Sequence, residues 1–283
     1  MLKKIDRAKV FLKAHAQVFA CPLCHEKMQA TESGLVCAQH HRFDLSKKGT
    51  LYFLKSQLKS DYDAKLFAHR ARMIQGGMYD PLLEVLAKDL NQAKVLDIGC
   101  GEGSFLAQLT QKVTPALTVG FDIAKEGIYQ ASNHTQFDQA FWCVADLTNL
   151  PFADQSFDVL LNIFSPSNYR EFDRILAPGG KLLKVIPGEH YLKELRQAFY
   201  PNDARKQHYS NKAVVKKLLQ AYPDTTFEKV QYTFDIPEAL RLSLLEMSPL
   251  EWQVDPVIKQ ALQQAPLEKI TIDLLVAMSQ KAS

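Results

Sequence analysis

The chain has 283 residues, of which 47% are hydrophobic and 23% are charged, and its formal net charge is +3. This composition excludes disordered, collagen-like and disulfide-stapled proteins, and the small net charge gives no global sign of a nucleic-acid partner. No stretch approaches the roughly 18 apolar residues that a membrane span needs, and Lys13 and His15 interrupt any signal-peptide core. We therefore expect a cytoplasmic protein with no membrane partner.

Four regions differ in their sequence pattern, and a C-terminal tail follows them. Residues 1–20 are expected to form a helical extension, residues 21–54 a small module with short β-like runs, and residues 55–92 a basic helical linker. Residues 93–187 alternate short apolar runs with helical segments, which is typical of a parallel α/β sheet. With the tail included, residues 93–283 are predicted to form one domain.

The strands of this sheet are predicted where the short apolar runs recur. They are expected at Lys94–Ile98, Leu117–Ile123, Phe141–Asp146, Phe157–Phe164 and Lys181–Pro187. Helices fit between them, and the last helix is expected to begin after Ser165 and to end at residues 178–180. The tail is predicted to hold a helix, a polar stretch and two β-rich runs, at Tyr191–Tyr200, Asn202–Asn211, Phe227–Phe234 and Lys269–Val276.

The small module contains a cluster of cysteines and histidines with the spacing Cys21-x2-Cys24-x12-Cys37-x3-His41. Two close thiolates followed by a Cys/His pair match a tetrahedral zinc site. His40 is an alternative fourth ligand, and His25 is a weaker one. Four protein ligands leave no position for water, so the predicted zinc is structural, and so small a module depends on it for folding. Three unrelated cysteines are the disfavoured alternative.

A glycine-rich loop, Gly99–Gly103, follows the first predicted strand of the α/β region. A dinucleotide fingerprint would need glycine at Ser104, and the lysine of a phosphate-binding Walker loop is absent. Asp97 and Glu102 would repel phosphate, so they suit a ligand with a cationic end, such as S-adenosylmethionine. Asp122 ends the second strand, where a carboxylate accepts hydrogen bonds from ribose hydroxyls. Asp146 ends the third strand and can accept from an adenine amino group.

These features resemble the class I S-adenosylmethionine-dependent methyltransferases over roughly residues 93–187. The N-terminal module, including the run Cys37–Asp44, is similar to the zinc domain of the bacterial 23S ribosomal RNA (guanine-N1) methyltransferases. Similarity to that family continues through Ala71-Arg72, Gly77–Leu82, Pro187–Leu195 and Leu245–Trp252. The resemblance therefore spans residues 21–252.

The resemblance implies an α/β fold with a Rossmann-like sheet, mostly parallel with an antiparallel C-terminal strand, plus the zinc module. It places the zinc ligands at Cys21, Cys24, Cys37 and His41. It adds cofactor contacts at Tyr79 and at either His190 or Tyr191. With the glycine loop and the strand-end acids, the predicted cofactor residues are Tyr79, Asp97, Gly99, Gly101, Glu102, Gly103, Asp122, Asp146, His190 and Tyr191.

Charge is concentrated between residues 42 and 72, where eight cations and three acids give a local net charge of +5. Cations contact phosphates and aromatic rings stack on unpaired bases, so this segment predicts RNA binding, although a solvated helical face is the alternative. Its cations are Arg42, Lys47, Lys48, Lys55, Lys59, Lys65, Arg70 and Arg72, and its aromatics are Tyr52, Phe53, Tyr62 and Phe67. A looser second set of cations comprises Arg196, Arg205, Lys206, Lys216 and Lys217.

The resemblance thus implies methyl transfer from S-adenosylmethionine to N1 of a guanine in a hairpin loop of 23S ribosomal RNA, and a homodimeric state is left open. At the end of the fourth strand, Asn162 or Ser165 is expected to hydrogen-bond the base and Phe164 to stack on it. No residue is assigned as the general base. One alternative is a methyltransferase for another RNA or a small molecule, with the zinc module as a docking surface. Another is a zinc RNA-binding protein whose methyltransferase fold has lost activity.

Overall fold

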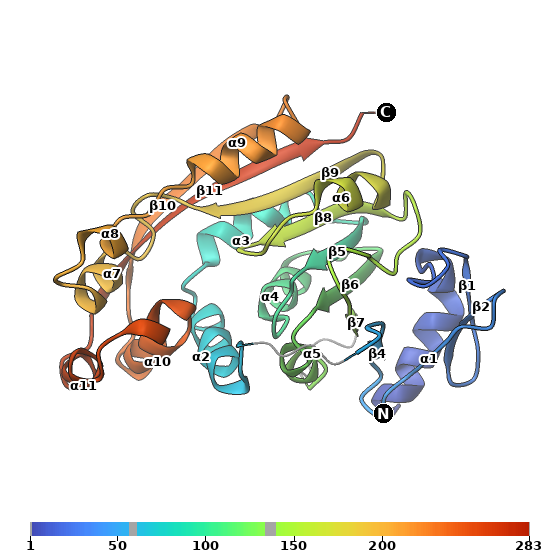
Figure 1. The fold of residues 1–283 in the computed structure, drawn as a ribbon, viewed down its shortest axis with the longest axis horizontal. Coiled ribbons are helices and arrows are strands. Elements are labelled where there is room, and N and C mark those ends of the chain that lie inside the picture. Colours follow the sequence, from blue (N-terminus) through green and yellow to red (C-terminus); the bar gives the residue numbers. More distant parts are fainter. Residues whose placement is uncertain (1, 57–60, 134–139, 283) are drawn as a thin grey trace.

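Eight strands form one large sheet at the centre of the molecule, in the order β10-β11-β9-β8-β5-β6-β7-β4 (Figure 1). The computed structural model describes residues 2–56, 61–133 and 140–282. Within these residues, β11 alone runs opposite to the other strands of this sheet. The predicted α/β architecture, mostly parallel with an antiparallel C-terminal strand, is confirmed. The strands are β4 (Leu51–Tyr52), β5 (Lys94–Ile98), β6 (Leu117–Asp122), β7 (Ala140–Val144), β8 (Phe157–Ile163), β9 (Leu176–Pro187), β10 (Thr226–Asp235) and β11 (Lys269–Gln280).

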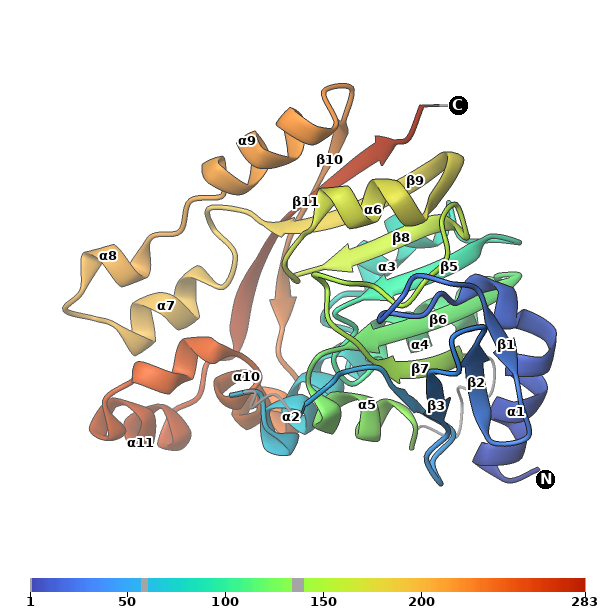
Figure 2. The ribbon, with the colours of Figure 1, turned by 45° about the vertical axis from the view of Figure 1, so that its right-hand side comes forward.

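Helices cover both faces of the sheet, because side chains alternate between the two faces along each strand. In β8, Leu161 and Ile163 belong to one buried cluster, whereas Leu160 belongs to the other. Figure 2 shows α6 on the near side of the sheet and α3 and α4 on the far side. The first cluster includes residues of α2 (Ala64–Gln75), α3 (Asp80–Ala87), α4 (Ser104–Lys112) and α5 (Lys125–Ala131), and the second includes residues of α1 (Lys4–His15), α6 (Tyr169–Ile175) and α9 (Lys212–Ala221).

The helix that precedes β9 ends earlier than the sequence predicts. α6 stops at Ile175, and residues 178–180, the predicted end of the helix, lie within β9. Leu176 takes an extended conformation, with φ −68° and ψ 132°, and its N–H bonds to the carbonyl of Phe172. Pro178 disfavours a helical conformation at Ala177, so the chain becomes extended before the proline.

The N-terminal module packs against the large sheet and shares its core. Phe19 is fully buried, and its ring centroid lies 5.6 Å from that of Phe141, 5.7 Å from that of Phe152 and 6.0 Å from that of Phe53. The backbone of Phe19 also bridges that of Phe152, and β4 pairs in parallel with β7. The module is therefore continuous with the sheet. Its own antiparallel strands are β1 (Met28–Ala30), β2 (Gly34–Cys37) and β3 (Arg42–Asp44).

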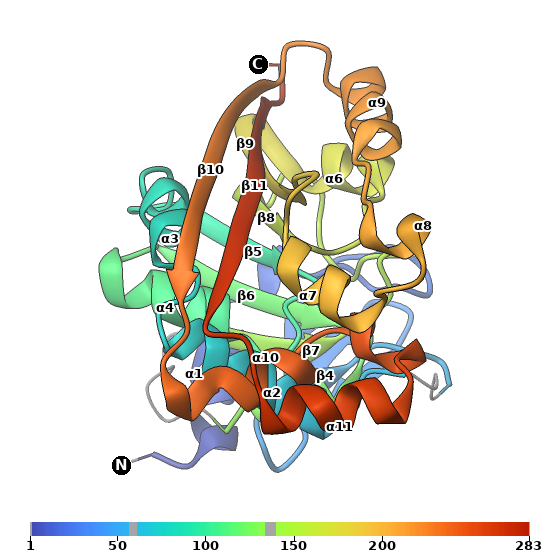
Figure 3. The same ribbon diagram turned by 90° about the vertical axis from the view of Figure 1, so that its left-hand side faces the viewer.

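A second group of helices gathers near the carboxyl ends of the parallel strands (Figure 3). α10 packs against α2, and α11 packs against α7. α7 lies within the helix predicted at residues 191–200, whereas α10 and α11 lie where no element is predicted. None of the helices described is long and apolar enough to cross a membrane. The group consists of α7 (Lys193–Phe199), α8 (Ala204–Gln207), α10 (Arg241–Glu246), the 3-10 helix η3 (Pro249–Gln253) and α11 (Pro256–Gln264).

Candidate functional site

A cavity of about 820 Å³ lies at the carboxyl ends of β5, β6, β7 and β8, between the sheet and the second group of helices. Ligands of open α/β sheets bind at this edge. The structure brings seven of the predicted cofactor residues to the cavity wall. They are Tyr79, Gly99, Gly101, Glu102, Asp122, Asp146 and Tyr191.

The glycine loop folds around the carboxylate of Asp122. The N–H of Gly101 donates to Oδ2 of Asp122 at 2.8 Å, and the N–H of Ala124 donates to Oδ1 at 2.7 Å. Gly101 reaches this position with φ +56°, a conformation that disfavours other residues. Gly103 has φ +77° and does not line the cavity, but a Cβ there would lie 2.5 Å from the ring of Trp142. The loop therefore fixes Asp122 at the edge of the cavity.

Three acids lie together at this end of the cavity, and two of them, Asp97 and Glu102, are buried. Burial, together with the neighbouring charges of Asp122 and Glu102, raises the pKa of Asp97 to about 8. Burial also raises the pKa of Glu102 and that of Asp122, although Arg70 opposes both shifts. Asp97 is 2% exposed and lies behind the cavity wall rather than on it. A cationic ligand would stabilise the ionised acids, so these residues fit the sulfonium and ammonium groups of S-adenosylmethionine.

Asp146 lies in the loop after β7, which is held from two sides. The N–H of Thr148 donates to Oδ1 of Asp146 at 2.8 Å, which closes a local turn. Further along the loop, Nδ2 of Asn149 donates to the carbonyl oxygen of Pro22 at 2.7 Å. Pro22 lies between the first two cysteines of the zinc module. The loop that carries Asp146 is thus fastened to the module.

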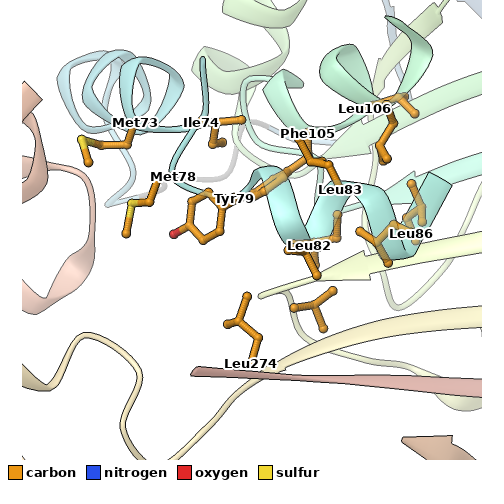
Figure 4. Packing of buried hydrophobic residues seen from close by; sticks show 14 of the residues in the cluster. Met73, Ile74, Met78, Tyr79, Leu82, Leu83, Leu86, Phe105, Leu106 and Leu274 are labelled. Atoms are coloured by element: carbon orange, nitrogen blue, oxygen red, sulfur yellow. The ribbon is translucent and has the colours of Figure 1, made fainter. Parts of the chain in front are cut away.

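Aromatic rings form another wall of the cavity. The hydroxyls of Tyr79 and Tyr191 are hydrogen-bonded at 2.6 Å, and the ring of Phe164 stacks on that of Tyr191 with centroids 5.5 Å apart. Figure 4 shows Tyr79 at the edge of the buried cluster, with its hydroxyl pointing away from Leu82. Burial raises the pKa of Tyr191 to about 12 and holds that of Tyr79 well above its ordinary value, so both phenols stay neutral at physiological pH. They can donate hydrogen bonds to a ligand but are poor bases.

The structure separates the two residues between which the resemblance did not decide. Tyr191 lines the cavity, whereas His190 is exposed and does not line it. The backbone N–H of His190 donates instead to Oδ2 of Asp273 at 2.9 Å. This bond anchors the loop that presents Tyr191.

Asn162 is not available to a substrate, contrary to the sequence-based expectation. It is fully buried, and its Nδ2 donates to Oγ of Ser165 and to the carbonyl of Pro166, while its Oδ1 accepts from Lys184. Ser165 lines the cavity, but its hydroxyl proton is used in a 2.6 Å bond to the carbonyl of Ile98. Phe164 is 36% exposed at the cavity, with φ +54°, and remains available for stacking.

The far end of the cavity is formed by residues that were not predicted to belong to one site. Arg196, Lys206 and His208 line it, together with Trp252, which is 46% exposed. Arg70 also lines the cavity, and its Nε donates to the carbonyl of Met247. These residues come from α2, α7, α8 and η3, so only the tertiary fold brings them together. The cavity therefore has an acidic end and a cationic, aromatic end.

The four predicted metal ligands converge in the N-terminal module. The ligand atoms of Cys21, Cys24, Cys37 and His41 lie within 4.8 Å of one another. Nδ1 of His41 is 3.5 Å from the sulfur of Cys21 and 3.5 Å from that of Cys37, and the sulfurs of Cys24 and Cys37 are 3.6 Å apart. Tetrahedral zinc with ordinary bond lengths requires about 3.6 Å between sulfur and nitrogen and about 3.8 Å between sulfurs. The donor set therefore fits zinc.

The two alternative metal ligands lie outside the cluster. His25 and His40 are exposed, with φ +62° and φ +61°, and each follows a turn that begins at a ligand cysteine. The N–H of His25 bonds to the carbonyl of Cys21, and the N–H of His40 bonds to that of Cys37. Their backbone conformation shapes the two turns, which place the ligand atoms.

The basic segment of residues 42–72 is only partly a free surface. Phe53 and Phe67 are buried, so the expectation that they stack on bases is wrong. Phe67 lies on the apolar face of α2, which packs into the core. Lys65 is paired with Glu246 at 2.9 Å, and Lys59 lies outside the described residues. Exposed cations remain at Arg42, Lys47, Lys55 and Arg72.

Comparison with known proteins identifies two segments of the chain. Residues 19–61 match the family model described as "RlmA, N-terminal", a zinc ribbon, and residues 89–234 match the model of a methyltransferase domain. YxjB of Bacillus subtilis, whose name provisionally describes a 23S rRNA (guanine-N1)-methyltransferase, is 37% identical over 93% of this chain and 97% of its own length. The 23S rRNA (guanine(748)-N(1))-methyltransferase of Streptomyces fradiae is 29% identical over 83% of this chain and 86% of its own length.

A solved structure supports the fold independently. The phosphoethanolamine N-methyltransferase 2 of Haemonchus contortus, in complex with S-adenosyl-L-methionine, matches 80% of this chain and 59% of its own with a TM-score of 0.52. Its sequence is 16% identical, so the match concerns the fold alone. The predicted class I methyltransferase fold with an N-terminal zinc module is confirmed.

Proposed function

Because the chain belongs to the family of 23S rRNA (guanine-N1)-methyltransferases, we propose that it methylates N1 of a guanine in 23S ribosomal RNA with S-adenosylmethionine. The observation that carries this function is the cavity with two unlike ends. One end has buried acids and the glycine loop, and the other has cations and aromatic rings. A cationic methyl donor and a nucleotide substrate can therefore meet in one cavity.

The residues at the acidic end suit the cofactor. When bound, S-adenosylmethionine supplies a methyl group on a sulfonium sulfur that leaves as a thioether. We assign Asp122 to the ribose hydroxyls and Asp146 to the adenine amino group, because both line the cavity at strand ends. We assign Glu102 to offset the positive charge of the donor, because it lines the cavity. Tyr79 and Tyr191 close the site against water at the aromatic wall.

The substrate end suits an unpaired guanine. A base must leave its stack before an enzyme can reach N1, and hairpin loops present such bases. The half-exposed ring of Phe164 offers a stacking surface beside Tyr191. We propose that the exposed cations Arg42, Lys47 and Lys55 contact phosphates of the RNA outside the cavity. We therefore propose a hairpin loop as the target.

The zinc module has a structural role in this proposal. Zinc fixes the turns at residues 21–25 and 37–41, and the module fastens the loop of Asp146 through the bond between Asn149 and Pro22. We propose residues 21–54 as this module and residues 93–283 as the methyltransferase domain, with helices of residues 55–92 in its core. None of the five cysteines forms a disulfide, which suits a reducing compartment such as the cytoplasm.

One experiment tests the function. The protein is incubated with unmodified 23S ribosomal RNA and S-adenosylmethionine that carries a labelled methyl group, and modified positions are mapped by primer extension. N1 methylation blocks base pairing, so we expect label in the RNA and a stop at one guanine. Label that enters a small molecule or a different RNA, but not 23S ribosomal RNA, would support the alternative substrates instead.

A further inference from the structure

Within the part of the chain that the structure describes, no carboxylate lines the substrate end of the cavity. Among the described residues, the acids that line the cavity are Glu102, Asp122 and Asp146, and all three lie at the cofactor end. Guanine N1 carries a proton near neutral pH, and it must lose this proton to become a nucleophile. The side chains at the substrate end are cationic or aromatic instead. A cation helps such a reaction by stabilising the anion that deprotonation leaves.

Arg196 is the cation most closely tied to the aromatic wall. It lies on α7 and lines the cavity, and its Nε donates to the carbonyl of Tyr191 at 3.2 Å. Its guanidinium carbon lies 5.2 Å from the ring centroid of Tyr209. Tyr191 in turn stacks with Phe164, the proposed platform for the base. The guanidinium is thus held on the wall that would face the reacting guanine.

The charge of Arg196 is not matched by a carboxylate. No ion pair to Arg196 occurs within residues 2–56, 61–133 and 140–282, and the side chain is half-buried. Burial of a cation without a counter-ion is costly, so the site favours an anion from outside. Arg70 differs, because its charge acts on Glu102 and Asp122 at the cofactor end. Lys206 differs too, since it is exposed and bonded to Gln253.

The charged groups around Arg196 leave it uncompensated. Three phenols face it, and the acids of the elements packed against α7 are engaged elsewhere. On α7 itself, Glu194 accepts two bonds from Thr271 of β11. The phenols are those of Tyr191, Tyr200 and Tyr209. Glu251 of η3 forms an ion pair with Lys259 of α11, and Asp273 of β11 forms one with Lys229 of β10.

We propose that Arg196 is a catalytic residue that binds O6 of the target guanine and stabilises the negative charge formed there as N1 is deprotonated. The inference deepens the proposed function and rests on it. The N1–H bond breaks and its proton passes to solvent water, while the charge is shared between N1 and O6. The bond from N1 to the methyl carbon forms as the carbon–sulfur bond breaks, and that electron pair stays on the sulfur of the neutral thioether. A planar guanidinium keeps its charge throughout.

The test is single-turnover methyl transfer between about pH 6 and pH 10, in the full-length protein with zinc bound. We expect Arg196→Gln to lower the rate at neutral pH by roughly 100-fold to 1,000-fold. The rate should then recover as the pH rises, because solvent alone ionises guanine there. Arg196→Lys should retain part of the wild-type rate. Calorimetric binding of S-adenosylmethionine should not change in either variant.

Matched variants separate charge at this position from charge elsewhere. Lys206→Gln should raise KM without moving the pH profile, and Arg170→Gln, an exposed position on α6, should behave as wild type. If Arg196→Gln does not fold, Tyr209→Leu, which removes the ring beside the guanidinium, should shift the pH profile in the same direction. An Arg196→Gln enzyme that binds S-adenosylmethionine but keeps the wild-type pH profile overturns the inference. Failure of the wild-type protein to methylate 23S ribosomal RNA would instead overturn the proposed function.

Discussion

Replacement of Asp97 by asparagine should stabilise the protein relative to the wild type, and this advantage should grow as the pH rises. Asp97 ends β5 and is 2% exposed, and burial raises its pKa to about 8, helped by Asp122 and Glu102. In the unfolded chain the same carboxyl has its ordinary value of 3.8. The folded state therefore binds a proton that the unfolded chain releases. The stability that this bound proton contributes is fully present below the pKa that Asp97 has in the unfolded chain. It is lost as the pH rises toward the pKa that Asp97 has in the folded protein.

The size of the effect follows from this difference. A group that is protonated only in the folded state lowers the free energy of unfolding by about 1.4 kcal/mol for each unit of pH. Between about pH 5 and pH 7.5 the loss through Asp97 is therefore about 3 kcal/mol. Asparagine does not titrate, so Asp97→Asn should gain that amount over the wild type across this interval. Any change in packing caused by the substitution alters the free energy of unfolding by the same amount at every pH.

Urea unfolding of both proteins at several pH values measures this difference. Asp224→Asn, at an exposed turn, controls for the loss of one negative charge. We expect the stability difference between Asp97→Asn and the wild type to widen steadily with pH. A difference that is equal at pH values near 5 and near 7.5 would refute the reasoning, because it would mean that Asp97 is ionised in both states.

Three further changes test the metal site and the glycine loop. Cys24→Ser, or removal of zinc with a chelator, should lower the melting temperature and unfold the module, as measured by circular dichroism and zinc release. Asp122→Asn should weaken S-adenosylmethionine binding roughly tenfold to a hundredfold in calorimetry, because hydrogen bonds to an ionised group contribute about 1.5–3 kcal/mol. Gly103→Ala should cost at least about 2 kcal/mol in urea unfolding, since alanine is strained at positive φ and its Cβ would meet Trp142.

The strands, the metal cluster and the glycine loop could be predicted, because each has a signal in a short stretch of the sequence. Short apolar runs located β5, β6 and β8 to within one residue at each end, because a parallel strand buried on both faces is mostly apolar. The spacing of the cysteines located the metal cluster, since ligands of one zinc ion must lie on two short turns. The glycine loop was equally visible, because its positive φ values restrict the residues that fit.

The cationic end of the cavity had no such signal. Arg196, Lys206 and Trp252 lie on separate elements, and their proximity depends on how α7, α8 and η3 pack. The burial of Phe67 could have been recognised, because Phe67, Ala71 and Ile74 recur at helical spacing on one face of α2. The misplaced end of α6 has a similar cause. A proline and two glycines mark a break in the chain but do not specify on which side of them the helix stops.

The pairing of β4 with β7 has a consequence for the outer edge of the large sheet. Without β4, β7 would be the outer strand of the large sheet, with a row of N–H and C=O groups free to pair with another chain. Two residues of β4 and the Phe19 region cover this border. An outer strand as short as β4 offers little template for further pairing. The N-terminal segment therefore protects this edge of the sheet from pairing with a strand of another chain, and this role does not depend on RNA.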